Sequence, residues 1–206
     1  MASYYMLNKP MGYITARSDP RHKTVMDLFP EEMRDKLFPV GRLDKDTEGL
    51  LLVTDDGALN HDLLTPESHI DKTYRFYAIG EISEERFSHL TLGAEVFPGK
   101  DYVTAPARVR IFGKCRISEI RELLPPRFSS MAQKKPLREV SFGEVIITEG
   151  KKHQVKRMVA YSGGEVVYLM RAAIGGLKLD PSLKKGSYRQ LTEEEVKILK
   201  NRTENA

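Results

Sequence analysis

A group of charged side chains lies directly before a continuous apolar run of the chain. The group extends from Gly41 to Gly49, and the apolar run at positions 50–53 has the sequence Leu-Leu-Leu-Val. Asp44 lies between Arg42 and Lys45 in the sequence, and cations near a carboxylate favour its ionised form. A permanently charged carboxylate beside a core strand is suited to act as a nucleophile or as a base.

Two other interpretations of this cluster stay open. One is a solvated turn in which Asp46 or Thr47 caps the local backbone. The other is phosphoryl transfer, in which Asp44 and Asp46 hold Mg²⁺ and one of them attacks phosphorus. Phosphatases of that type use a D-x-D-x-T pattern, whereas Thr47 comes one position early. The chain also has neither a P-loop nor the alternating strands and helices that their fold needs, so phosphoryl transfer is disfavoured.

A second cluster combines a glycine with four cations. Gly150 precedes a helix that we expect from about residue 152 to residue 161. The cations at this helix start are Lys151, Lys152, Lys156 and Arg157. A helix start after glycine directs free backbone N–H groups outward, and the cations add formal charge. The pattern favours contact with the phosphates of RNA or DNA.

The distribution of charge supports a polyanionic partner. The chain has 206 residues and a formal net charge of +4, from 33 basic and 29 acidic side chains. Residues 114–138 carry seven basic and two acidic side chains, and residues 151–157 carry four basic and no acidic ones. The remainder is therefore acidic, and the positive charge is concentrated in two stretches. The alternative is a solvated charged face, in which acidic side chains would normally be interleaved with the basic ones.

Composition excludes several classes of protein. An apolar content of 40% is enough for a hydrophobic core, which excludes a disordered chain, a coiled coil and collagen. The single cysteine, Cys115, cannot form an internal disulfide, and the five histidines show no metal-ligand spacing. No apolar run approaches the length of a membrane span, and the first ten residues lack the layout of a signal peptide. We therefore expect a soluble, monomeric protein in the cytoplasm, without a metal site.

Hydrophobic periodicity indicates the elements that position these clusters. We expect a hairpin of strands at 4–7 and 13–15, and further strands at 49–53, 73–79, 107–112, 140–148, 166–170 and 176–179. We expect helices at 25–29, 58–64, from Ser83 to Gly93, at 152–161 and from Thr192 onward, and a loop over 125–136. Strands outnumber helices and do not alternate with them one for one. This predicts an α+β fold with a largely antiparallel sheet.

Several separated motifs, taken in order, resemble the RsuA-like family of ribosomal RNA pseudouridine synthases, from about residue 4 to about residue 190. The motifs are Leu7-Asn8-Lys9-Pro10-Met11-Gly12, Gly41-Arg42-Leu43-Asp44 with Thr47-Glu48-Gly49, Lys72-Thr73-Tyr74, residues 149–158, and Leu169-Met170-Arg171 with Ile174-Gly175. The resemblance implies a pseudouridine synthase fold: a mainly antiparallel mixed sheet flanked by helices, with an active-site cleft across the sheet.

The resemblance implies an RNA pseudouridine synthase that isomerises one uridine of ribosomal RNA after base flipping, without cofactor or metal. Its partner would be ribosomal RNA or a ribosome assembly intermediate. Residues 54–57, His61 and His69 favour the small-subunit RNA. Two alternatives stay open: a large-subunit enzyme, and a non-catalytic RNA-binding protein with the same fold.

The resemblance also implies roles for individual residues. Asp44 would be the essential catalytic carboxylate, Tyr74 would pack against the target base, and Lys156 would pair with Asp44. The residues that would hold phosphates and orient the active-site loop are Arg42, Lys152, His153, Arg157 and Arg171. Outside this context, Tyr74 would be an ordinary half-buried aromatic residue on an alternating strand.

The domain organisation that follows is a single catalytic domain over residues 1–206 with two sub-halves. We expect the N-terminal S4-type RNA-binding module of related enzymes to be absent. We expect a basic insertion near residues 114–138 to form a mobile arm that gains order on RNA and compensates for that module.

Overall fold

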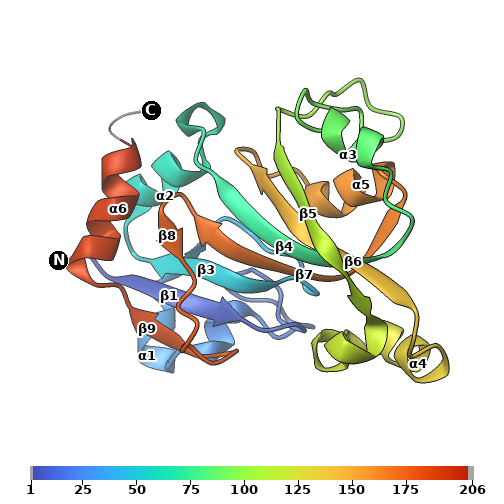
Figure 1. Cartoon of the computed structure of the whole chain (residues 1–206). Coiled ribbons are helices and arrows are strands. Elements are labelled where there is room, and N and C mark those ends of the chain that lie inside the picture. Colours follow the sequence, from blue (N-terminus) through green and yellow to red (C-terminus); the bar gives the residue numbers. More distant parts are fainter. Residues whose placement is uncertain (1, 204–206) are drawn as a thin grey trace. The chain divides into compact units, whose positions relative to one another are not determined.

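The computed structural model describes residues 2–203 of the chain. The chain forms two compact units (Figure 1). Unit 1 consists of residues 1–72 and 170–206, and unit 2 consists of residues 73–169. Strand β7 (Gly164–Ile174) begins in unit 2 and ends in unit 1. The strands form a mixed, mainly antiparallel sheet flanked by helices, so the predicted α+β class is confirmed.

The sheet of unit 1 is built around a strand with no exposed residue. Its strands are β1 (Tyr4–Lys9), β2 (Phe38–Val40), β3 (Glu48–Thr54), the end of β7, β8 (Leu177–Lys178) and β9 (Tyr188–Gln190). Their order is β7-β3-β1-β9, with β2 on β3 and β8 on β7. All seven residues of β3 are buried. Strand β3 is parallel to β7 and antiparallel to β1, which explains why its sequence is a continuous apolar run rather than an alternating one.

The expected hairpin of 4–7 with 13–15 is wrong. Strand β1 pairs with β3 and β9, with Leu7 opposite Leu51. Ile14 forms only an isolated bridge with Thr24. The turn at Gly12, which has a φ of 90°, is present. The prediction of a turn was therefore correct, but the prediction of its strand partner was not. Pairing with the fully buried β3 buries more of the apolar surface of β1 than pairing with residues 13–15 would.

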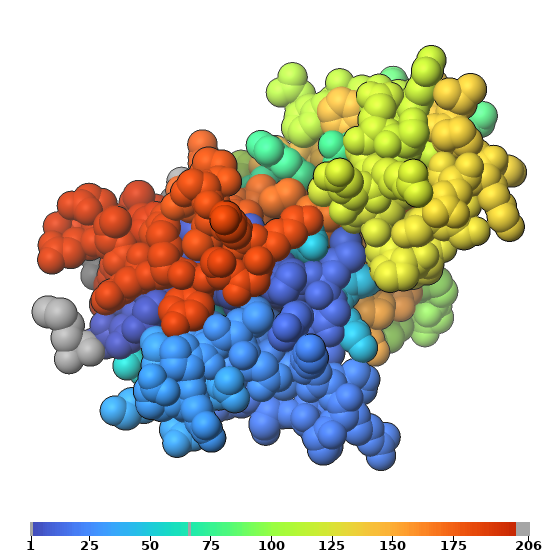
Figure 2. Space-filling view, turned by 90° about the horizontal axis from the view of Figure 1, so that it is seen from below, coloured from blue at the N-terminus to red at the C-terminus, as the bar shows by residue number. Residues whose placement is uncertain are grey.

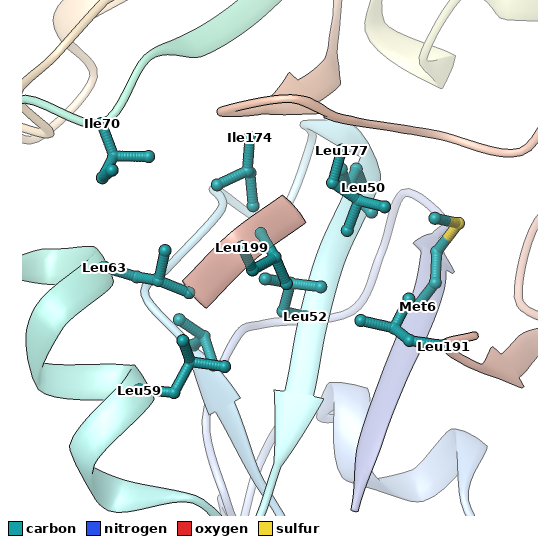
Figure 3. Packing of buried hydrophobic residues seen from close by; sticks show 11 residues of the cluster. Met6, Leu50, Leu52, Leu59, Leu63, Ile70, Ile174, Leu177, Leu191 and Leu199 are labelled. Atoms are coloured by element: carbon teal, nitrogen blue, oxygen red, sulfur yellow. The ribbon is translucent and has the colours of Figure 1, made fainter. Parts of the chain in front are cut away.

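Short helices cover the sheet of unit 1. They are η1 (Val25–Leu28), α1 (Glu31–Arg34), α2 (Gly57–Leu64), η2 (Pro66–Ser68) and α6 (Glu193–Thr203). Helix α2 begins at Asp56, whose side chain accepts a hydrogen bond from the Leu59 N–H at 3.0 Å. The core between α2, α6 and the sheet includes Met6, Leu50, Leu52, Leu59, Leu63, Ile174, Leu177 and Leu199 (Figure 3). Figure 2 shows the C-terminal segment lying against the N-terminal segment, where β9 pairs with β1.

The sheet of unit 2 has the order β5-β6-β4-β7. Its strands are β4 (Lys72–Gly80, from its second residue), β5 (Arg108–Arg116), β6 (Glu139–Ile147) and the first part of β7. Its helices are α3 (Glu84–His89), η3 (Ile117–Leu123), α4 (Pro126–Lys134) and α5 (Gln154–Tyr161). Strand β4 alternates as predicted, because Tyr74, Phe76 and Ala78 are buried while Arg75 is exposed.

Within the basic segment 114–138, residues 125–136 are not the loop that we expected. The segment forms the end of β5, then η3 and α4. Its apolar side chains join a buried core of unit 2: Ile117, Ile120, Leu124, Phe128 and Ala132. Their spacing of three or four residues is helical. The Pro125-Pro126 pair suggested a break, but proline is well tolerated at the first position of a helix, where Pro126 lies. The expectation of a mobile arm is therefore wrong.

Candidate active site

The backbone on both sides of Asp44 is held by buried polar side chains of unit 1. Thr15 Oγ1 donates to the Leu43 carbonyl at 2.8 Å and accepts from the Leu43 N–H at 3.0 Å. The Lys9 ammonium donates to the Asp44 carbonyl at 3.0 Å and to the Thr47 carbonyl at 2.8 Å. The Thr47 N–H also donates to the Asp44 carbonyl, at 3.1 Å. These bonds leave the loop little freedom, so the backbone that carries the Asp44 side chain is fixed in advance.

Lys9 is the centre of this arrangement. Its side chain has 0% exposed surface, although it carries a charge. The ammonium contacts four backbone carbonyls, those of Pro10, Asp44, Lys45 and Thr47, at 3.1, 3.0, 3.5 and 2.8 Å. A buried ammonium is tolerated only where such acceptors replace water. The sequence analysis included Lys9 only as part of a motif and assigned it no role. Its position at the end of an apolar strand is the feature from which a structural role could have been predicted.

The start of β3 requires a glycine and a buried arginine. Gly49 has a φ of 99°, and a Cβ atom there would lie 2.3 Å from the Arg171 carbonyl oxygen. Arg171 on β7 has 3% exposed surface, and its Nε donates to the Leu50 carbonyl at 2.8 Å. Its Nη2 is buried without a hydrogen-bond partner in residues 2–203. This burial favours the predicted role of orienting the active-site loop over a contact with phosphate.

Neighbouring side chains of the loop differ in exposure. Arg42 is exposed, and Asp44 is half-buried. Glu48 is buried and forms an ion pair with Lys185 at 2.6 Å. Thr47 is also buried, and within the described part of the chain its Oγ1 has no hydrogen-bond partner, which contradicts a turn capped by the Thr47 side chain. Of these four side chains, only those of Arg42 and Asp44 are accessible to solvent to more than a small extent.

In unit 2, a carboxylate organises the start of α5. Glu149 accepts hydrogen bonds from the Tyr102 hydroxyl, from the Ala105 N–H at 2.9 Å and from Gln154 Nε2 at 2.5 Å. The Gln154 side chain in turn accepts from the Lys151 N–H at 2.9 Å. Burial, together with the bond to Glu149, raises the pKa of Tyr102 to about 12, so the hydroxyl keeps its proton. Sequence reasoning missed Tyr102 and the role of Glu149, the acid that directly precedes the basic cluster.

Helix α5 begins two residues later than predicted. His153 has a left-handed backbone with a φ of 57°, which cannot continue into a right-handed helix. Lys152 and His153 are exposed, whereas Lys156 and Arg157 are half-buried.

The predicted site residue on β4, Tyr74, has 8% exposed surface. The predicted residues of unit 2 are therefore Tyr74, Lys152, His153, Lys156 and Arg157, and those of unit 1 are Arg42, Asp44 and Arg171. The pairing of Asp44 with Lys156 joins residues of different units and stays a prediction.

No group of three or more His, Cys, Asp or Glu side chains in the described residues could hold a metal ion. Over the same part of the chain, no helix is long and apolar enough to cross a membrane.

Comparison with known proteins identifies the class of this chain. Residues 3–161 match the model of the RNA pseudouridylate synthase family. The chain is 44% identical over 197 residues to the uncharacterized RNA pseudouridine synthase YtzG of Bacillus subtilis (strain 168), covering 95% of this chain and 72% of that protein. It is 36% identical over 193 residues to ribosomal small subunit pseudouridine synthase A of Escherichia coli (strain K12), covering 94% of this chain and 72% of that protein.

A solved structure supports the same assignment. The crystal structure of a pseudouridylate synthase has a TM-score of 0.78 and 34% identity to this chain, covering 97% of this chain and 74% of that one. The chain belongs to the RNA pseudouridine synthases, a family of isomerases. The predicted family, fold and enzyme class are confirmed, and phosphoryl transfer is excluded as the activity.

Proposed function

We propose that this enzyme converts one uridine of small-subunit ribosomal RNA to pseudouridine, with Asp44 as the essential carboxylate. The observation that carries the proposal is the loop of Asp44, whose backbone is held by Lys9 and Thr15 while Arg42 remains exposed. The choice of RNA is supported by the relative named ribosomal small subunit pseudouridine synthase A. We propose further that the enzyme is a monomer that acts in the cytoplasm on ribosomal RNA or an assembly intermediate.

The reaction replaces the N1 bond between uracil and ribose by a bond from C5; C5 loses its proton and N1 gains one, so the product is an isomer of uridine. An ionised carboxylate can serve either as a nucleophile toward the uracil or the sugar, or as a base toward the sugar. Each of these roles needs a carboxylate that is charged and fixed before the substrate arrives. The backbone bonds on both sides of Asp44 help to fix the residue before the substrate binds.

We assign the remaining residues to binding and support. Tyr74 packs against the target base, and Lys156 pairs with Asp44 and keeps it ionised. Because a stacked base is out of reach of a carboxylate in a folded protein, the uridine leaves its stack before it reacts. The side chains assigned to RNA phosphates are Arg42, Lys152, His153 and Arg157. Arg171, which is buried against Leu50, holds the loop of Asp44 in place.

Modification mapping tests this function. The purified protein is incubated with unmodified small-subunit RNA, unmodified large-subunit RNA and assembly intermediates, and pseudouridine is mapped at each position. We expect one new site in small-subunit RNA, and none with Asp44→Asn. A new site confined to large-subunit RNA would overturn the choice of RNA. No new site in any of these substrates would favour an RNA-binding protein without activity.

A further inference from the structure

A pocket of unit 2 combines aromatic rings with cations. Its volume is about 400 Å³, and small-ligand pockets typically have about 300–1,000 Å³. The aromatic and cationic side chains that line it are Phe97, Lys100, Tyr102, Lys151, Lys152 and Arg157. Phe97 and Tyr102 come from the segment between α3 and β5, to which no function has been assigned above.

Rings and cations alternate in this pocket. The rings of Phe97 and Tyr102 meet edge to face, with centroids 5.7 Å apart and an interplanar angle of 72°. The Lys151 ammonium lies 4.9 Å from the centroid of Tyr102, and the Arg157 guanidinium lies 5.2 Å from the centroid of Phe97. Because the Tyr102 hydroxyl is bound to Glu149, its ring is fixed before a ligand arrives. Such preorganisation lowers the entropic cost of binding.

The side chains that line the pocket carry a net positive charge. Four of its lining side chains are cations and one, Asp101, is an acid. Lys100, Lys151 and Lys152 are exposed. Between residues 2 and 203, no carboxylate forms an ion pair with any of the four cations, and the buried Nε of Arg157 has no hydrogen-bond acceptor. An anion is therefore the ligand that this charge favours.

We propose that this pocket binds one nucleotide of a single-stranded segment of the RNA substrate. The lysines and Arg157 hold its phosphate, and its base stacks on the ring of Tyr102. Aromatic rings and guanidinium planes are the groups on which unpaired RNA bases stack. Inorganic phosphate would contact only the cations, because it has no base that could stack on the aromatic rings. The proposal deepens the proposed function and rests on it only in taking RNA as the ligand.

Two variants of the full chain separate phosphate contact from base contact. Lys100→Gln with Lys151→Gln removes two exposed cations, and Tyr102→Leu removes the ring. The control is Lys178→Gln with Lys197→Gln, which makes the same change in charge at two exposed positions of unit 1. Dissociation constants are measured for a short single-stranded RNA, uridine 5′-monophosphate and inorganic phosphate over a range of salt concentrations. Circular dichroism checks that each variant is folded.

We expect the dissociation constant for RNA to rise about tenfold in Tyr102→Leu, because one stacked base is lost. The double lysine variant should also weaken RNA binding, and its salt slope should fall by about 1.4, or about 0.7 for each phosphate contact in a single strand. Tyr102→Leu should bind inorganic phosphate as tightly as the wild type does. RNA containing 4-thiouridine should crosslink to the peptide that contains Tyr102, and the control should bind RNA within twofold of the wild type.

Unchanged RNA affinity and salt slope in the double lysine variant would overturn the proposal, even if Tyr102→Leu failed to fold. Equal weakening of RNA and inorganic phosphate by Tyr102→Leu would reduce the pocket to an anion site. Pseudouridine formation by the wild type is measured in parallel. If the wild type is active and the variants bind RNA normally, the pocket assignment alone is wrong. If the wild type is inactive on every RNA, the proposed function is wrong. The binding data still show whether the pocket binds RNA.

Discussion

The ammonium of Lys9 lies 3.0 Å from the main-chain carbonyl oxygen of Asp44. The bond links the end of β1 to the loop before β3, and it involves the backbone of Asp44 rather than its carboxylate. Lys9 therefore supports the position of the loop through its main chain. A substitution of Lys9 should therefore lower the stability of the protein, whereas a substitution of the Asp44 side chain should lower its activity.

Lys9→Met should destabilise the protein. The substitution keeps most of the side-chain volume but removes the ammonium that donates to the backbone carbonyls of Asp44 and Thr47. Leaving such acceptors unsatisfied should lower the free energy of unfolding by about 3 kcal/mol. Urea denaturation measures the change. Lys178→Met, at an exposed lysine, is the control; a loss of less than about 0.5 kcal/mol in Lys9→Met, as expected for a surface site, would contradict the structural role.

Asp44→Asn should abolish turnover and leave stability and RNA binding close to the wild type. The bonds from Lys9 and from the Thr47 N–H reach the main-chain carbonyl of Asp44, which the substitution does not change. The charge of the carboxylate is lost, so we expect the rate to fall at least about 10³-fold. Single-turnover modification assays and thermal melting give the two readouts. Activity within tenfold of the wild type would show that another residue is the essential carboxylate.

Lys156→Met should lower the rate of modification about 100-fold if Lys156 keeps Asp44 ionised. Lys156→Arg retains the charge and is the matched variant, so it should recover much of the lost activity. Both variants are compared at saturating RNA, where weakened binding does not limit the rate. Equal activity of the methionine and arginine variants would mean that the charge of Lys156 has no part in the reaction.

Gly49→Ala should be strongly destabilising. Its φ of 99° disfavours a side chain, and the added Cβ would lie 2.3 Å from the Arg171 carbonyl oxygen. Since β3 and β7 would have to separate at this point, we expect a loss of about 3 kcal/mol. Gly57→Ala at the start of α2, where a Cβ meets nothing within 4 Å, is the matched control and should be neutral or stabilising. Similar unfolding curves for both variants would refute the close approach.

The basic side chains around the end of α4 should contribute to RNA affinity through charge alone. Lys134→Gln, Lys135→Gln and Arg138→Gln together remove three cations from a segment that is already folded. If each contacts a phosphate, the salt slope for single-stranded RNA should fall by about 2. Filter binding at several salt concentrations measures it. An unchanged affinity and slope would mean that these side chains are only solvated.

Much of the fold could be predicted from local pattern. The alternation over 73–79 predicted β4, the apolar run before Thr54 predicted β3, and Ser83 was correctly placed before α3, where it accepts from the Arg86 N–H at 3.3 Å. Each of these signals lies within a few residues, because side-chain periodicity and helix caps depend on neighbouring positions. The motifs that indicated the family are local in the same sense.

Other features depend on residues far apart in the chain. The partner of β1 is β3 rather than 13–15, because strand pairing is decided by how much apolar surface each arrangement buries. The packing of 117–132 against Val140 and Val167 turns a basic, proline-containing segment into ordered helices. The burial of Lys9 is possible because the folded loop brings three carbonyls, those of Asp44, Lys45 and Thr47, to its ammonium, in addition to that of Pro10. Composition and motifs thus determined the family, the fold class and the candidate carboxylate, while long-range packing decided the strand partners, the order of the basic segment and the lysine that holds the loop of Asp44.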